Sequence, residues 1–274
     1  MFEIERIIQT ALREDIGSGD ITTLSTVPLG TTVRAELVAK EDFILSGIDV
    51  ARRVFSQLDA EVAFEALRVD GCSVKRGEVI AWIKGDAHTL LQGERVALNL
   101  LQRMSGVATH TAAFVAAVAG TGAVIVDTRK TTPGLRALDK YSVRMGGGQN
   151  HRTSLYDGVL IKENHIAAAG GISAAVAGAK QRAPHTLKVE VETENMDDVR
   201  EALEAGADII MLDNMDLDTM CAAVSLIDGR AVTEASGGVN LDSVTEIAQT
   251  GVNLISVGAL THSSRAVDIS MLFQ

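Results

Sequence analysis

The sequence has few aromatic residues, no excess of positive charge and no long apolar run. Aromatics make up 3% of the 274 residues, so a base-stacking platform for nucleic acid is not expected. The net charge of −11 argues against nucleic acid and anionic lipid as partners, since both bind through summed positive potential. No apolar run approaches the roughly 18 residues of a membrane span. With 46% hydrophobic residues, the composition is instead that of a globular protein.

Cysteine is scarce as well. Cys72 and Cys221 stand alone without CxxC spacing, which gives no support for a disulfide framework or a zinc site. A reactive thiol is the alternative for either cysteine, but we expect both to be buried and inert. The first residues lack a basic region followed by an apolar stretch, so a reduced, cytoplasmic protein is expected.

From about residue 123 onward, short β-branched runs alternate with helical segments. Such runs are typical of buried parallel strands, and the last four begin about 21 to 23 residues apart, which fits repeated βα units. In the segment 195–207, Asn195 is the expected helix N-cap and Gly206 the residue that follows the helix end. The expected strands are 123–126, 158–161, 187–191, 208–212, 231–235 and 254–258. The repetition predicts a parallel α/β barrel.

The first 105 residues have a different pattern. A helix is expected near Glu3–Arg13, followed by strands punctuated by Gly and Asp that indicate a separate antiparallel sheet. An Ala-rich helix, about Thr89–Val118, joins this part to the barrel. The predicted domains are 1–105 and 106–265, with the apolar segment 266–274 packing back on the first.

Every expected barrel strand is followed by polar or glycine residues. The carboxyl ends of parallel barrel strands converge on one face, where active sites lie. Ordinary helix caps would explain single positions but not the lysines and acids together. The residues are Asp127–Lys130, Lys162–His165, Glu192, Asp213, Asn214, Ser236–Gly238 and Gly258.

The segment 129–162 contains seven basic and two acidic side chains, which gives a local charge of +5. Clustered Arg and Lys favour a small ligand with several anionic groups. A solvated helical face is the alternative, above all for Arg136, Lys140 and Arg144. His151 follows a Gly146–Gly148 run and precedes Arg152, which favours a ligand contact over a core histidine.

The last two strand ends offer backbone N–H groups and hydroxyls. Ser236, Gly237 and Gly238 after one strand, and Gly258 after the next, predict a phosphate cradle. Glu192 and Asp213 are candidates to hold Mg²⁺ or sugar hydroxyls, or to stabilise a developing cation. Salt bridges to Lys130 or Lys162 are the structural alternative.

Several segments resemble the quinolinate phosphoribosyltransferase family over nearly the whole chain. They include DTRKTTPG, GGGQNHR, GVLIKENH, VEVETEN, EASGGV and the N-terminal LLQGERVALN. The resemblance implies an α/β protein with an incomplete parallel α/β barrel and an N-terminal α+β sandwich domain. It implies a reaction in which quinolinate and phosphoribosyl pyrophosphate give nicotinate mononucleotide, pyrophosphate and CO₂, with Mg²⁺, in NAD biosynthesis.

The resemblance also implies roles for individual residues. The quinolinate carboxylates would meet Arg129, His151, Arg152 and Lys162, with Arg95 added from a neighbouring subunit of a homodimer. Lys130 would face the pyrophosphate, and Glu192 and Asp213 would serve the ribose and the metal. The 5′-phosphate contacts would be Ser236, Gly237, Gly238 and Gly258. Assembly beyond the dimer stays open.

Three other functions fit parts of the pattern. A Schiff-base aldolase would use Lys162 as its strand-end lysine. A non-catalytic anion-binding protein would keep the basic residues but need neither Glu192 nor Asp213. A relative that acts on another aromatic acid would share the fold, and the intact TRKTTPG and NHR blocks argue against it.

Overall fold

The computed structural model describes residues 2–274, which form two compact units. Unit 1 combines the chain up to Ala112 with Thr131–Gly147 and Ser263–Gln274, and unit 2 combines Ala113–Lys130 with Gly148–His262. Among the helices of residues 2–274, none has both the length and the apolar character that crossing a membrane requires.

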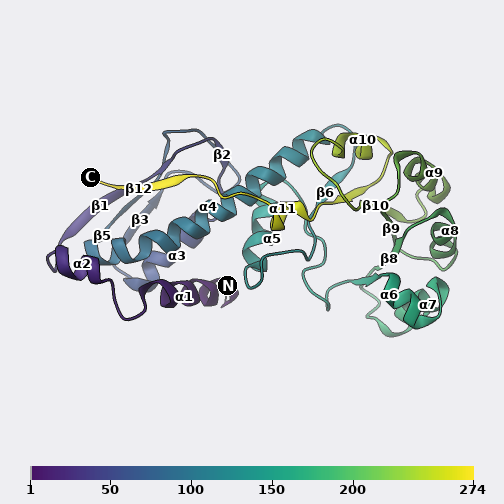
Figure 1. Cartoon of the computed structure of the whole chain (residues 1–274), viewed down its shortest axis with the longest axis horizontal. Coiled ribbons are helices and arrows are strands. Elements are labelled where there is room, and N and C mark those ends of the chain that lie inside the picture. Colours follow the sequence, from purple (N-terminus) through teal and green to yellow (C-terminus); the bar gives the residue numbers. More distant parts are fainter. Residues whose placement is uncertain (1) are drawn as a thin grey trace. The chain divides into compact units, whose positions relative to one another are not determined.

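Unit 1 is an antiparallel sheet with helices packed beside it (Figure 1). Its four-stranded sheet has the order β12-β1-β5-β3, and its core includes Ile8 of α1, Phe55 of α3 and Leu101 of α4. The elements are α1 (Phe2–Ile16), α2 (Ile21–Thr26), β1 (Thr32–Ala39), β2 (Phe43–Ile44), α3 (Ile48–Leu58), β3 (Ala63–Ala66), β4 (Ser73–Val74), β5 (Val79–Asp86), α4 (Ala87–Ala117, whose last turns belong to unit 2), α5 (Arg136–Met145) and β12 (Ile269–Phe273). The expected first helix and the long Ala-rich helix are thus α1 and α4.

The compact units differ from a division of the chain at a single boundary near residue 105. Thr131–Gly147 returns to unit 1 because polar contacts and buried Leu138 hold α5 there. Arg103 of α4 donates to Asp139 at 2.9 Å, and the Tyr141 hydroxyl donates to Asp70 at 2.7 Å. β12 pairs antiparallel with β1, which places the apolar C-terminal segment on the sheet of unit 1.

Unit 2 is a six-stranded, wholly parallel sheet in the order β6-β11-β10-β9-β8-β7, with helices along its outside (Figure 1). A full barrel of this type has eight strands, so this barrel is incomplete, as predicted. The elements are β6 (Val124–Val126), β7 (Val159–Ile161), α6 (Glu163–Ala169), α7 (Ile172–Arg182), β8 (Val189–Thr193), α8 (Met196–Glu204), β9 (Ile209–Asp213), α9 (Leu217–Ile227), β10 (Val232–Ser236), α10 (Val244–Gln249), β11 (Leu254–Ser256) and α11 (Ala259–His262).

All six predicted barrel strands are present, with one shifted by two residues. The run 187–191 was expected to pair, whereas β8 begins at Val189, because its ladder with β7 starts there opposite Val159. Asn195 caps α8 by accepting from the backbone N–H groups of Asp197 and Asp198, and Gly206 has a φ of +78° just beyond the helix. Both helix-end predictions are confirmed.

The expectation that both cysteines are buried is wrong. The thiols are free, but Cys72 is half-buried and Cys221 is exposed. Cys221 lies on the outer side of α9, whose inner side presents Met220, Ala223 and Ile227 to the core. The sequence of α9 is apolar on several faces, so it did not indicate that Cys221 lies on the exposed one.

Candidate active site

A cavity of about 490 Å³ lies at the carboxyl ends of the unit 2 strands, where the sequence predicted an active site. Ten of the twelve predicted site residues line this strand-end pocket: Arg129, Lys130, His151, Arg152, Lys162, Glu192, Asp213, Ser236, Gly237 and Gly238. Its other lining residues are Thr128, Leu160, Met211, Asn214, Glu234 and Ser256. Strand ends far apart in sequence therefore meet at one place.

A buried carboxylate positions the His151–Arg152 turn. Asp127 at the end of β6 is fully buried and accepts from the Asn150 side chain at 2.6 Å and from the backbone N–H of His151 at 2.8 Å. A parallel bridge between Val126 and Gln149 extends the same contact along the free edge of β6. The segment that carries His151 and Arg152 is thus held to the barrel wall.

The pocket concentrates positive charge. Burial, and next the neighbouring Arg129 guanidinium, lower the pKa of Arg152. Arg152 also donates to the Gly158 carbonyl at 3.2 Å, which fixes its direction. Two guanidinium groups that repel each other in one cavity favour an anion between them.

The same pocket contains two acidic side chains at strand ends, Glu192 and Asp213. Glu192 at the end of β8 forms an ion pair with Lys162, so the salt bridge that was the structural alternative for Glu192 is present. Asp213 accepts from the Asn214 side chain at 2.6 Å. Carboxylate oxygens on adjacent strands are ligands that Mg²⁺ accepts in proteins, so the donor set fits this ion.

The conformation of the loop after β10 requires glycine at position 237. Gly237 has a φ of +96°, and a Cβ there would overlap the Asn214 side chain. Gly258 does not line the pocket, but a Cβ on it would lie 3.1 Å from the Lys130 side chain. The buried Thr261 hydroxyl donates to the Lys130 carbonyl at 2.8 Å, which ties the loop after β11 to Lys130.

The remaining predicted basic residues lie in unit 1. Arg95 is an exposed residue of α4. On α5, Arg136 donates to the Thr131 hydroxyl at 2.9 Å and Arg144 lies 5.6 Å from the Tyr141 ring centre. Lys140 is 3% exposed, so the solvated-face interpretation does not apply to it.

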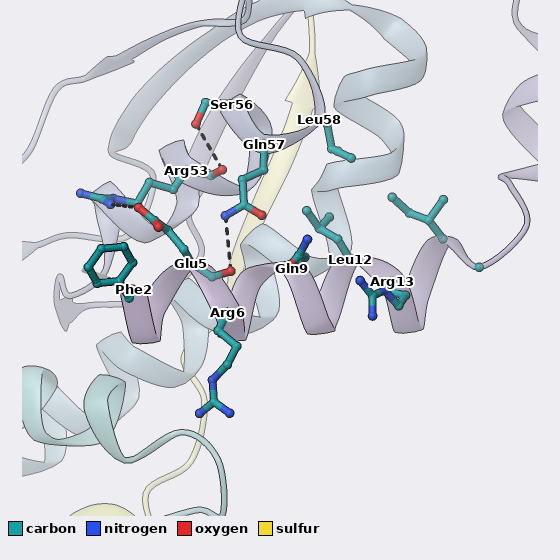
Figure 2. Close-up of a pocket in the computed structure, with 12 residues that line it drawn as sticks. Phe2, Glu5, Arg6, Gln9, Leu12, Arg13, Arg53, Ser56, Gln57 and Leu58 are labelled. Carbon is teal, nitrogen blue, oxygen red and sulfur yellow. Dashed lines mark hydrogen bonds and ion pairs between the residues drawn. The ribbon is translucent and has the colours of Figure 1, made fainter.

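Unit 1 also contains an open groove of about 970 Å³ between α1 and α3 (Figure 2). Arg53 and Glu5 lie 3.6 Å apart across it, and the Gln57 side chain donates to the Glu5 carbonyl at 3.4 Å. None of the predicted site residues lines this groove.

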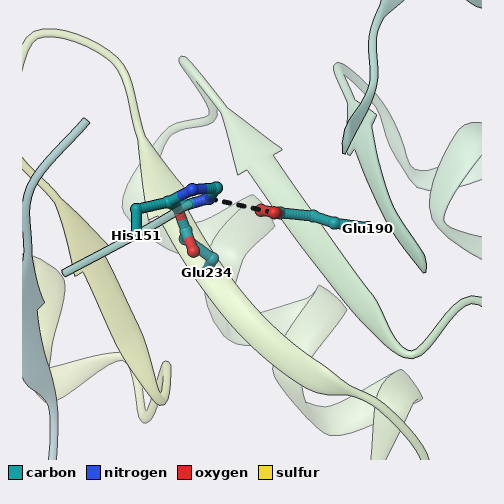
Figure 3. Close-up of side chains that lie close together, drawn as sticks. All are labelled: His151, Glu190 and Glu234. Atoms are coloured by element: carbon teal, nitrogen blue, oxygen red, sulfur yellow. Dashed lines mark ion pairs between the residues drawn. The ribbon is translucent and has the colours of Figure 1, made fainter. Parts of the chain in front are cut away.

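Two glutamates beneath the pocket were missed by the sequence analysis. Glu190 on β8 and Glu234 on β10 are 4% and 1% exposed and lie against His151 (Figure 3). The Nε2 atom of His151 is 3.0 Å from Glu190 and 3.7 Å from Glu234. Burial, and next the Glu190 carboxylate, raise the pKa of Glu234 to about 7. The sequence did contain a signal for these residues, since each glutamate lies inside a run expected to be a buried strand and acidic side chains are rarely buried without a partner.

Fold and pocket together define an α/β-barrel protein with a pocket of basic and acidic side chains at its strand ends. The model of the quinolinate phosphoribosyl transferase C-terminal domain matches residues 107–272, and that of the N-terminal domain matches residues 20–105. The chain belongs to the quinolinate phosphoribosyl transferase family.

Individual relatives agree with this assignment. The chain is 47% identical over 269 residues to a probable carboxylating nicotinate-nucleotide pyrophosphorylase of Bacillus subtilis, covering 98% of this chain and 93% of the relative. It is similar to the solved structure of NadC from Streptococcus pyogenes, with a TM-score of 0.96 and 42% identity over 100% of this chain and 97% of the other. The nicotinate-nucleotide pyrophosphorylase of Francisella tularensis gives a TM-score of 0.96 and 41% identity, with 99% and 96% covered.

Proposed function

We propose that this protein transfers the phosphoribosyl group of phosphoribosyl pyrophosphate to quinolinate and releases CO₂ and pyrophosphate, as a step of NAD biosynthesis. The observation that carries the proposal is that one pocket joins paired guanidinium groups, two strand-end acids and a glycine loop. Family membership supports the same reaction, since a relative 47% identical over most of both chains is named for it.

The basic side of the pocket binds the acid substrate. Arg129, Arg152 and Lys162 provide the charge for two carboxylates, and His151 forms the adjacent wall. Lys162 is paired with Glu192 in the structure, so a substrate carboxylate would compete with Glu192 for the Lys162 ammonium.

The opposite side receives the phosphoribosyl donor. The backbone N–H groups and hydroxyl of Ser236–Gly238 bind the 5′-phosphate together with Gly258, which adjoins the Lys130 side chain. Lys130 itself faces the pyrophosphate. Glu192 and Asp213 would hold Mg²⁺, which would neutralise pyrophosphate charge when bound. The same two acids face the sugar carbon that becomes positive.

The chemistry needs positioning more than proton transfer. Departure of pyrophosphate leaves an oxocarbenium-like ribose carbon, which the pyridine nitrogen of quinolinate attacks. The resulting pyridinium draws in the electron pair of the bond to the 2-carboxylate, CO₂ leaves, and the ring carbon takes up a proton. The protein orients the two substrates and stabilises the developing charges.

The enzyme acts in the cytoplasm as a homodimer. In this dimer, Arg95 of each subunit completes the site of the other. Two observations support a role for Arg95 away from its own unit's core. The side chain is exposed on α4, and it belongs to the same GER segment that carries the family resemblance. A two-fold interface would repeat this contribution at both sites.

Release of labelled CO₂ tests the function directly. Quinolinate labelled in its 2-carboxyl group should release label only when phosphoribosyl pyrophosphate and Mg²⁺ are both present. Release without the sugar donor, or none with it, contradicts the proposal. Borohydride trapping of a carbonyl substrate on Lys162 would instead indicate an aldolase.

A further inference from the structure

The barrel interior contains acidic side chains one layer below the strand-end pocket. Residues two apart on a strand point to the same side, so Glu190 lies below Glu192 and Glu234 lies below Ser236. Aliphatic side chains usually fill this layer of a barrel. Two nearly unexposed carboxyl groups there, at 4% and 1% exposure, require a compensating charge or a proton.

The hydrogen bonds of His151 show which of the two glutamates accepts its ring N–H. Its Nδ1 accepts the Arg152 backbone N–H at 2.7 Å, so the ring proton is on Nε2. Nε2 faces Glu190 at 3.0 Å, so Glu190 accepts this hydrogen bond. The same Nε2–H leaves this nitrogen no lone pair for a metal ion, which argues against a metal site within this trio.

Glu234 has weaker contacts, of which the Ser256 hydroxyl lies close enough to favour its charged form. His151 Nε2 is 3.7 Å away and already donates to Glu190, and the nearby Ser256 hydroxyl donates to the Ala235 carbonyl at 3.3 Å. Within residues 2–274, neither carboxyl oxygen of Glu234 accepts a hydrogen bond by the distance and angle limits of a normal bond. The groups opposite it on the neighbouring strands, Met211 and Leu254, are apolar. His151 with a single ring proton is neutral, so ionising Glu234 would place a negative charge beside Glu190 with no cation among these three side chains to compensate it.

We propose that Glu234 takes up a proton when a dianionic aromatic acid binds in the strand-end pocket. Protonation removes the negative charge of Glu234 from the floor of the pocket, and the pocket can then accept a dianion. The proposal rests on the proposed function, because that function supplies the dicarboxylate ligand. Glu234 lines the strand-end pocket directly, and an ionised carboxylate there would repel the ligand. Burial and the charge of Glu190 already raise the pKa of Glu234 to about 7, which places the event near neutral pH.

A second cavity gives the proton a separate route. This lower pocket, of about 340 Å³, is lined by Lys188, Glu190, Leu254 and His151, among others, and Glu234 lines it too. Glu234 is thus a boundary between the two cavities. Water in the lower pocket can exchange protons with Glu234 while the ligand occupies the strand-end pocket.

Calorimetric titration of quinolinate into the full-length protein, at pH 7.5 in buffers of different ionisation enthalpy, counts the protons taken up. We expect between about half and one proton for wild type, and an affinity that falls about tenfold per pH unit above pH 7. Glu234→Gln should bind with uptake near zero and a flatter pH profile. The matched control is Glu246→Gln, an exposed glutamate on α10, which should behave as wild type.

Uptake that is absent in wild type, or that persists unchanged in Glu234→Gln, overturns the proposal. If quinolinate does not bind wild type at any pH, the proposed function fails instead. Should Glu234→Gln not fold, infrared difference spectra of wild type with ¹³C-labelled glutamate carboxyls decide the question. Ligand binding should then add the isotope-shifted carbonyl band of a neutral glutamic acid, and an unchanged spectrum contradicts the proposal.

Discussion

The charged side chains of the strand-end pocket differ in what their replacement removes. Arg152→Ala and Lys162→Ala should each weaken quinolinate binding by roughly 2 to 5 kcal/mol, because each deletes the partner of a desolvated carboxylate. Calorimetry measures the change, with Arg200→Ala, an exposed arginine on α8, as the control. Unchanged affinity in both variants would remove these residues from the acid subsite.

The two strand-end acids should affect turnover more than binding. Glu192→Gln and Asp213→Asn keep the shape of each side chain but remove its charge from the sugar carbon that becomes positive. We expect kcat to fall strongly while quinolinate still binds. If kcat stays within about threefold of wild type in both, under roughly 1 kcal/mol of barrier, the acids have a structural role.

Glu234 should make stability depend on pH. Its pKa rises from 4.5 to about 7 on folding, so the native state holds this proton more tightly than the unfolded chain does. The associated stability is complete below pH 4.5 and is lost as the pH rises to about 7 and above. The loss is on the order of 3 kcal/mol. Glu234→Gln does not titrate, so its free energy of unfolding relative to wild type should rise from pH 4.5 to pH 8 in urea titrations. An unchanged difference across that range would contradict the buried acid.

Among the structural elements, the barrel strands were the easiest to predict and the barrel interior the hardest. β-branched runs and their polar ends follow from local sequence, and ten predicted residues do line one pocket. The contact of His151 with Glu190 and Glu234 joins three separate segments, so no local pattern contains it. The placement of α5 in unit 1 has the same origin, since it depends on Arg103 and Asp70 pairing with distant residues.

The loop after β10 depends on one backbone conformation. Gly237→Ala should destabilise the protein by about 1 to 3 kcal/mol and raise the KM for phosphoribosyl pyrophosphate, because the left-handed φ is strained and the added Cβ overlaps Asn214. Gly178→Ala on α7 is the matched control, since a Cβ there meets nothing within 4 Å and a helix favours alanine. A KM unchanged by Gly237→Ala would separate this loop from the sugar donor.

Assembly of the chain with a second copy determines whether the pocket is complete. Arg95→Ala and Arg129→Ala should each be nearly inactive alone. When the two are unfolded, mixed and refolded, half the dimers are hybrids, and each hybrid has one site with both arginines. Activity should return to about one quarter of wild type. A mixture no more active than its components, with hybrid dimers shown by mass spectrometry, would place Arg95 outside the partner's site.

The pairing of β12 with β1 has a consequence for synthesis on the ribosome. β1 is made early, but its outer neighbour in the sheet is made only after the entire barrel has been translated. At roughly 5 to 20 residues per second, the β1 edge therefore stays open on the order of ten seconds or more. During that interval an unpaired strand edge is available to other nascent chains or to chaperones. The N-terminal unit is thus begun first and completed last.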